Sequence, residues 1–253
     1  MTTPIEVLRD TFGYDAFRLP QDKVINTILA GDDALVIMPT GGGKSLCYQL
    51  PALMLPGVTV VISPLIALMA DQVASADQLG IRAAALHSNQ TREEQYAVRR
   101  QLHTGELDLI YLSPERVQQE DTQTWLLQSP VSLVAIDEAH CVSQWGHQFR
   151  PDYLALDWFR LQLPDIPVIA LTATANDQTR EEIITRLGIP NASVFVAGFD
   201  RPNIYYQVQH RANARDQLKA LLQAHIGDTG IIYCLSRKKV DLTEYWWCSE
   251  CFD

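Results

Sequence analysis

The chain has 253 residues, 47% of them hydrophobic and 20% charged, a balance typical of a globular protein and not of a disordered one. Its formal net charge of −10 argues against binding of DNA over the whole surface, although a few arginines along one groove still allow local contacts. No apolar run approaches the roughly 20 residues that cross a bilayer, and the N-terminus lacks a signal-peptide pattern. With five scattered cysteines, these features predict a cytoplasmic chain with reduced thiols and no membrane partner.

Short apolar runs alternate with helical patterns along the first 200 residues. The apolar runs predict strands at Ala34–Met38, Val58–Ser63, Leu109–Leu112, Leu133–Asp137 and Val168–Thr172. The stretches between them predict helices at Lys44–Leu53, Leu65–Leu79, Thr91–His103 and Gln178–Leu187, the last with Asp177 as its N-cap and Gly188 as its stop signal. This alternation predicts a doubly wound α/β domain over residues 1–200, in which helices cover both faces of a parallel sheet. Such sheets bind ligands at the carboxyl ends of their strands.

The stretch Gly198–Pro202 has the character of a domain boundary. Beyond it the sequence predicts only a strand at Ile204–Val208, a helix at Asp216–Ala224 and a strand at Gly230–Cys234. These elements are too few to bury a core, so residues 201–253 are interpreted as the incomplete start of a second domain in a truncated chain. The final segment, Leu242–Asp253, is rich in aromatic residues and shows no clear periodic pattern.

The segment MPTGGGKS follows an apolar strand and precedes a helix, which is the setting that a phosphate-binding loop requires. Glycines allow backbone amides to turn toward phosphate groups, and the helix N-terminus adds partial positive charge. Lys44 is expected to reach the β and γ phosphates, and Ser45 to offer a hydroxyl to Mg²⁺. The alternative, a glycine-rich turn with an incidental lysine, is disfavoured by this context. The residues expected to bind ATP are Met38 (where the usual pattern has glycine), Pro39, Thr40, Gly41, Gly42, Gly43, Lys44 and Ser45.

The segment LVAIDEAH places two carboxylates at the end of a predicted buried strand. A carboxylate there can reach the metal held by the phosphate loop, so Asp137 is expected to bind Mg²⁺. Glu138 is expected to orient or deprotonate the attacking water. Two solvated carboxylates that cap the next helix are the alternative, which becomes the minor interpretation once the phosphate loop is considered.

Upstream of the loop, the segment Phe12–Gln21 carries groups suited to adenine. Arg18 and Gln21 are expected to pair with its edge, and Tyr14 to stack on its face. The two phenylalanines of this segment would serve a hydrophobic core equally well.

Four further segments carry groups suited to nucleic acid. Small hydroxyl residues in Ser63–Met69, Leu112–Arg116 and Leu171–Ala175 can donate to a phosphate backbone. Cys141–Pro151 interleaves aromatic and charged side chains, as in surfaces that hold single strands. Ordinary helix capping and a loop packed by its own aromatics are the alternatives. The residues expected to contact DNA are Ser63, Pro64, Trp145, His147, Phe149 and Arg150.

The order of these segments resembles that of the RecQ family of superfamily 2 DNA helicases. MPTGGGKSLCYQ followed by DEAHCVSQWGH carries the resemblance, which continues through Phe199–Asn203 to Gly230–Arg237. It implies a first RecA-like domain that uses ATP and Mg²⁺ to drive 3′-to-5′ movement on DNA. It also implies that His140 and the aromatic-rich loop Trp145–Arg150 link the nucleotide state to DNA.

The chain departs from the family pattern in two positions and in its extent. Gln148 stands where the family usually has aspartate, and Leu235 where it usually has asparagine. The remainder of the second RecA-like domain, with its arginine finger, and the zinc-binding and winged-helix regions are missing from the sequence. Because an arginine finger contributes roughly 10³–10⁵ in rate, we expect this chain to bind ATP, to hydrolyse it slowly and not to unwind DNA alone. An RNA-remodelling DEAH-box ATPase and a non-catalytic nucleotide-binding module stay open as alternatives.

Overall fold

The computed structural model describes residues 2–144, 149–198 and 204–250, and its contacts divide the chain into two units, residues 1–200 and 201–253. Unit 1 holds seven strands: β1 (Ala34–Ile37), β2 (Val58–Ile62), β3 (Ala83–Leu86), β4 (Leu109–Leu112), β5 (Val131–Ile136), β6 (Val168–Thr172) and β7 (Ser193–Val196). Its helices are α1 (Pro4–Phe12), α2 (Gln21–Leu29), α3 (Leu46–Met54), α4 (Ile66–Gln78), α5 (Arg92–His103), α6 (Pro114–Val117), α7 (Glu120–Leu127), α8 (Trp158–Gln162) and α9 (Asp177–Arg186), with two 3₁₀ helices, η1 (Ala139–Val142) and η2 (Pro151–Asp157).

The strands form one parallel sheet in the order β3-β4-β2-β5-β6-β1-β7. Every strand predicted within residues 1–200 is present, and the predicted parallel sheet is confirmed. The prediction missed β3 and β7, which lie at the two edges of the sheet. The sequence of β3 is three alanines and a leucine, and three of the four residues of β7 are exposed, so neither shows the apolar run that marks a central strand.

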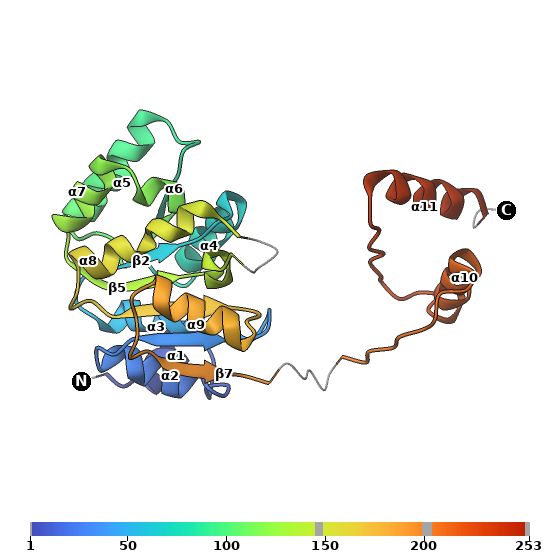
Figure 1. The fold of residues 1–253 in the computed structure, drawn as a ribbon, viewed down its shortest axis with the longest axis horizontal. Helices are drawn as coiled ribbons and strands as arrows, with labels where there is room; N and C mark the ends of the chain where they lie inside the picture. The colour runs from blue at the N-terminus through green and yellow to red at the C-terminus, as the bar shows by residue number, and fades with distance from the viewer. Residues whose placement is uncertain (1, 145–148, 199–203, 251–253) are drawn as a thin grey trace. The chain divides into compact units, whose positions relative to one another are not determined.

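Helices cover both faces of the sheet in unit 1 (Figure 1). Successive side chains of a strand point to opposite faces, so Leu35 belongs to one hydrophobic core and Val36 to the other. The first core is completed by apolar side chains of α5, α7, α8 and α9, and the second by those of α2, α3 and α4. Full burial of one such aliphatic side chain stabilises the fold by about 1.5–3 kcal/mol. Because each core contains many buried side chains, the two cores stabilise the sheet from both faces.

The helix ends show one error in the predictions. Asn176, not Asp177, caps α9, because the Asn176 side chain accepts a hydrogen bond of 2.8 Å from the backbone amide of Thr179. Asp177 is the first helical residue, and its carboxylate pairs with Arg180 at 3.0 Å. Gly188 follows the helix in the left-handed region, with φ of 65°, as expected of a stop signal.

Unit 2, taken by itself, contains α10 (Ala214–Ala224) and α11 (Arg237–Glu250). The strands predicted at Ile204–Val208 and Gly230–Cys234 are wrong, since neither segment joins a ladder. An apolar, β-branched run becomes a strand only when neighbouring strands take up its hydrogen bonds and cover one face. The final segment, which showed no periodic pattern, is helical as far as Glu250. Across the described residues, no helix combines the length and the apolar character needed to cross a bilayer.

Candidate active site

Three segments with predicted functional residues follow β1, β5 and β6. These strands are adjacent and parallel in the sheet, with β6 between the other two, so their carboxyl ends lie at the same edge. The glycine-rich segment 38–45 follows β1, the acidic segment 137–140 follows β5, and Thr172 ends β6. The sheet order therefore brings together groups that are up to 134 residues apart in the sequence.

The glycine-rich segment forms a tight loop that only glycine fits at two positions. Gly43 has φ of 83°, and a Cβ atom there would lie 2.4 Å from the Gln21 side-chain nitrogen. A Cβ atom on Gly42 would lie 2.9 Å from the carbonyl oxygen of Pro39, to which the Gly42 amide donates. Met38, where glycine was the usual residue, is buried in the core and donates its amide to Thr172. That position extends β1 and requires no glycine.

The side chain of Lys44 folds back across this loop. Its Nζ donates to the carbonyl oxygen of Met38 at 3.1 Å and to that of Pro39 at 3.5 Å. The positive charge of Lys44 favours the ionised form of both Asp137 and Glu138, although burial raises the pKa of Asp137 overall. The loop and the acidic pair therefore interact electrostatically, and their convergence on one magnesium-bound nucleotide stays a prediction.

A cavity of about 200 Å³ opens beside the loop. The side-chain amide of Gln21 donates to the carbonyl oxygen of Gly43 at 3.1 Å and accepts from the backbone of Arg18 at 2.9 Å. The Arg18 guanidinium donates to the carbonyl oxygen of Gly41 at 3.3 Å. The residues that line the cavity are Tyr14, Ala16, Arg18, Gln21, Gly43, Ser45, Leu46 and Gln49. All three residues predicted to contact adenine thus lie here. Gln49, the last residue of MPTGGGKSLCYQ, also lines the cavity, although no role was predicted for it.

The acidic pair occupies two different electrostatic environments. Burial and the neighbouring Glu138 raise the pKa of Asp137 to about 6. A hydrogen bond from His140 is the main cause of the lowered pKa of Glu138. Glu138 has φ of 49°, in the left-handed region that costs a non-glycine residue about 1–3 kcal/mol and that is common at functional sites. The pair therefore consists of one carboxyl that resists ionisation and one that ionises readily.

His140 joins the acidic segment to the end of β6. Its Nδ1 lies 2.9 Å from the hydroxyl of Thr172 and 3.3 Å from a carboxylate oxygen of Glu138. The Thr172 hydroxyl also donates to the carbonyl oxygen of Thr174 at 3.1 Å. The sequence marked Thr172 only as a possible phosphate donor, and its contact with His140 depends on the adjacency of β5 and β6. Sequence patterns also missed Tyr153, whose hydroxyl donates to the carbonyl oxygen of Asp137 at 2.9 Å.

The residues predicted to contact DNA are only partly assembled. The guanidinium of Arg150 donates to the carbonyl oxygen of Pro64 at 2.9 Å, which ties the segment after η1 to the segment after β2. Phe149 is half-buried, whereas Trp145 and His147 lie outside the described residues. The hydroxyl of Ser63 is buried and its amide donates to the carbonyl oxygen of Leu112, so its contact with DNA stays a prediction. Pro64 is half-buried beside it, and the next residue, Leu65, is exposed.

The residues at the strand ends fit a magnesium-bound nucleotide. Ser45 and Asp137 offer a hydroxyl and a carboxylate, and Mg²⁺ in phosphate sites takes one or two such oxygens together with those of its ligand. The buried Asp137 carboxyl, with its pKa of about 6, would be stabilised in its charged form by a cation. Among the described residues no three His, Cys, Asp or Glu side chains cluster in the manner of a metal site built by protein alone.

Comparison with known proteins identifies the family. The DEAD/DEAH box helicase family matches residues 18–183 of this chain. The chain is 48% identical over 239 residues to the ATP-dependent DNA helicase RecQ of Haemophilus influenzae, which covers 94% of this chain and 39% of that protein. It is 41% identical over 241 residues to the probable ATP-dependent DNA helicase RecS of Bacillus subtilis, covering 94% of this chain and 48% of that protein. The chain thus spans less than half the length of these relatives.

Solved helicase structures share the fold. The DUF1998 helicase MrfA superposes with a TM-score of 0.70 at 18% identity, over 99% of this chain and 42% of that one. The Hef helicase domain of Pyrococcus furiosus superposes with a TM-score of 0.58 at 22% identity, over 77% of this chain and 40% of that one. The parallel sheet has the RecA-like arrangement of these helicases. With the family match over residues 18–183, this places the chain in the DEAD/DEAH box helicase family.

Proposed function

We propose that the chain is the N-terminal part of a RecQ-type helicase that couples ATP hydrolysis to 3′-to-5′ unwinding of DNA. By itself it would bind ATP without unwinding DNA. The likeness to RecQ and RecS over 94% of the chain supports this proposal, as does the 39% share of RecQ that it spans. We further propose that residues 201–253 begin a second RecA-like domain and that the protein acts on DNA in the cytoplasm.

The proposed roles follow from the charges and hydrogen bonds at the strand ends. Lys44 would exchange its bonds to the loop carbonyls for bonds to the β and γ phosphates, while the loop amides surround the phosphate oxygens. Ser45 and Asp137 would hold Mg²⁺, which supplies charge neutralisation to the phosphates. Glu138, whose pKa is lowered, stays ionised at neutral pH and would accept a proton from the attacking water. Arg18, Gln21 and Tyr14 would hold adenine in the adjoining cavity.

DNA would run along the same edge of the sheet. Arg150 and Phe149, with Trp145 and His147, would contact the single strand, and Pro64 would border it. The hydrogen bond between His140 and Thr172 would connect this surface to Glu138, because His140 contacts both. Movement of either partner would then alter the position or the pKa of the carboxylate.

One observation carries the proposal: the glycine loop with Lys44 and the acidic pair follow β1 and β5, whose carboxyl ends lie at the same edge of the sheet. We expect Lys44→Ala to abolish measurable ATP binding in a titration with a fluorescent ATP analogue, since bonds to charged groups are the strong ones in such sites. Lys23→Ala, which removes an exposed lysine of α2, serves as the control and should retain affinity. Unchanged affinity in Lys44→Ala would refute the site.

The substrate is tested by ATPase activity with single-stranded DNA and with RNA of the same sequence. DNA should stimulate hydrolysis more strongly, both in this chain at its low rate and in a full-length relative. Stronger stimulation by RNA would favour an RNA-remodelling enzyme, and no hydrolysis under any condition would favour a non-catalytic module.

A further inference from the structure

A second pocket, of about 420 Å³, lies between α5 and α7, formed by residues outside the nucleotide cavity. Its walls combine positive groups with aromatic rings, and the described residues that form them include no carboxylate. The residues that line it are Tyr96, Arg99, Arg100, His103, Trp125, Gln128 and Ser129. Its volume falls within the range of about 300–1,000 Å³ that is typical of ligand sites.

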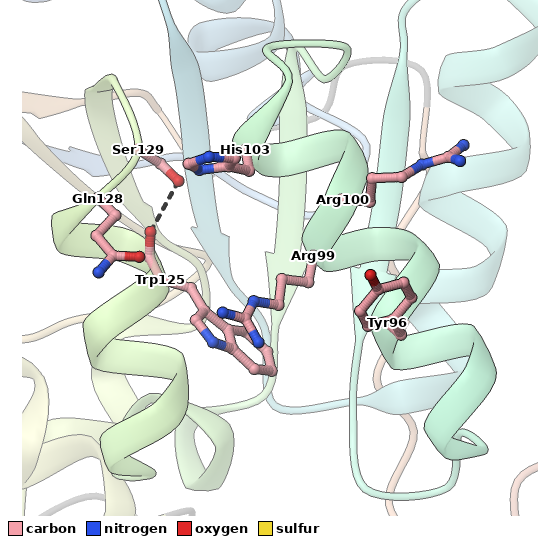
Figure 2. Close-up of a pocket in the computed structure, with 7 residues that line it drawn as sticks. All are labelled: Tyr96, Arg99, Arg100, His103, Trp125, Gln128 and Ser129. Atoms are coloured by element: carbon pink, nitrogen blue, oxygen red, sulfur yellow. Dashed lines mark hydrogen bonds between the residues drawn. The ribbon is translucent and has the colours of Figure 1, made fainter.

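The indole of Trp125 lines this pocket. Figure 2 shows Arg99 extending from α5 toward it, and the guanidinium carbon lies 4.9 Å from the ring centroid. The guanidinium of Arg116 lies 5.4 Å from the same ring and is fixed by an ion pair with Asp121. On the other side of the pocket, the Ser129 hydroxyl donates to the Trp125 carbonyl oxygen at the end of α7. The indole is therefore held in place before any ligand arrives.

The positive charge of the pocket has no acidic counterpart in the part of the chain that the structure describes. The chain carries 30 acidic and 20 basic residues, and some of its arginines have carboxylate partners. Arg82, Arg116 and Arg160 have such partners. Among the described residues, however, neither Arg99 nor Arg100 forms an ion pair. Two adjacent arginines of this kind, on a chain of this charge, point to an anionic ligand.

The aromatic rings narrow the chemistry of that ligand. Tyr96 is 67% exposed, so the face of its ring is open to stacking by a planar group. Tyr96 and His103 are separated by seven residues of α5, or about 10 Å at 1.5 Å per residue. Stacked bases of duplex DNA are about 3.4 Å apart, so this length exceeds a single nucleotide. In Figure 2, Arg100 extends away from α7, so the cationic surface continues past the pocket. Stacking surfaces interleaved with cations along such a length fit a strand better than one small molecule.

We propose that the pocket between α5 and α7 binds single-stranded DNA outside the edge of the sheet that holds the motor residues. Arg99 and Arg100 would contact phosphates, and Tyr96 would stack on a base. Arg116 belongs to the segment 112–116, which lies at the carboxyl end of β4, on the edge of the sheet that holds the motor residues. The contact of Arg116 with Trp125 therefore connects the pocket to that edge. The inference uses the proposed function only in taking DNA as the partner.

Photo-crosslinking locates the strand directly. The full chain is irradiated with a single-stranded oligonucleotide that carries 5-iododeoxyuridine, and the crosslinked peptides are mapped. We expect crosslinks at Tyr96 or Trp125; Tyr96→Ala should lose the former, and Tyr96→Phe should keep it. Crosslinks confined to residues 141–151 would overturn the pocket and leave the DNA contacts of the motor standing. A chain that crosslinks nowhere would contradict both.

Binding measured against salt gives a second readout. Tyr96→Ala should weaken binding of the single strand about fivefold or more, which Tyr96→Phe should not. In the double variant Arg99→Gln, Arg100→Gln, the slope of log affinity against log salt should fall by about 0.7 for each phosphate that the variant no longer binds. The control Lys23→Gln should keep the slope. Equal slopes in all three proteins, or displacement of DNA by an acidic peptide of the same charge, would overturn the proposal.

Discussion

The two units of this chain use similar apolar segments with opposite results. In unit 1, β6 reads VIALT and is completely buried between β5 and β1. In unit 2, the segment GIIYC carries comparable residues, yet Ile231 is 78% exposed and the segment joins no sheet. No residue described within 204–243 is buried. An apolar segment therefore forms a stable strand only where neighbouring elements bury it. The apolar residues alone are not sufficient.

The largest expected difference between the units is in proteolysis. Cleavage requires local opening, which needs little free energy where few side chains are buried. We expect limited trypsin digestion to trim the chain back to about residue 200 and to leave unit 1 intact, as mass spectrometry of the time course would show. A C-terminal segment as resistant as unit 1 would break the comparison.

Matched isoleucine substitutions measure the same difference as free energy. Ile169 is fully buried in β6, so Ile169→Ala should lower the free energy of unfolding by about 2–5 kcal/mol. Ile231→Ala should change it by less than about 0.5 kcal/mol, as is usual for surface positions. Urea unfolding of both variants provides the test. A cost above about 2 kcal/mol for Ile231→Ala would mean that unit 2 buries this residue in solution.

The buried carboxyl of Asp137 should give unit 1 a dependence on pH. Because its pKa in the folded chain, about 6, exceeds the ordinary value of 3.8, the folded state retains the proton as pH rises through this interval. The free energy of unfolding should therefore fall between about pH 4 and pH 6, by up to about 3 kcal/mol, and then level off.

In the variant Asp137→Asn, residue 137 cannot titrate. The free energy of unfolding, measured with urea, should therefore vary less between about pH 4 and pH 6 than in the unmodified chain. The comparison is best made above pH 4.5, because the lowered pKa of Glu138 acts in the opposite direction below its ordinary value of 4.5. Identical profiles for the two proteins would show that Asp137 titrates normally.

Helix capping should give the smallest effect. The Asn176 side chain caps α9 through the Thr179 amide, so Asn176→Ala should cost about 1 kcal/mol in thermal or urea unfolding. Asn213 occupies the equivalent position of α10 but forms no side-chain cap, and Asn213→Ala should cost less. Equal losses would indicate that capping is not what distinguishes these helices.

Sequence patterns were sufficient where the signal is local. The central strands of unit 1 are continuous apolar runs, and the phosphate loop is a short segment whose glycines are required by its own backbone. The patterns missed β3, because its alanines carry little hydrophobic signal. They also predicted strands in unit 2 at apolar segments that pair with no neighbouring strand. Nothing in SPLIALM indicates which way the Ser63 side chain turns, and only the structure shows that its hydroxyl is buried.

By itself, the sequence determined the central strands of the sheet, the glycine loop around Lys44 and the acidic pair after β5, because each depends on residues close together in the chain. Only the tertiary structure decided that His140 meets Thr172, that Gln21 packs under Gly43, and that Tyr96 and Trp125 form the walls of one pocket. These contacts join residues 22 to 32 positions apart. They form because strand order and helix packing set the distance between side chains, and no local pattern records either.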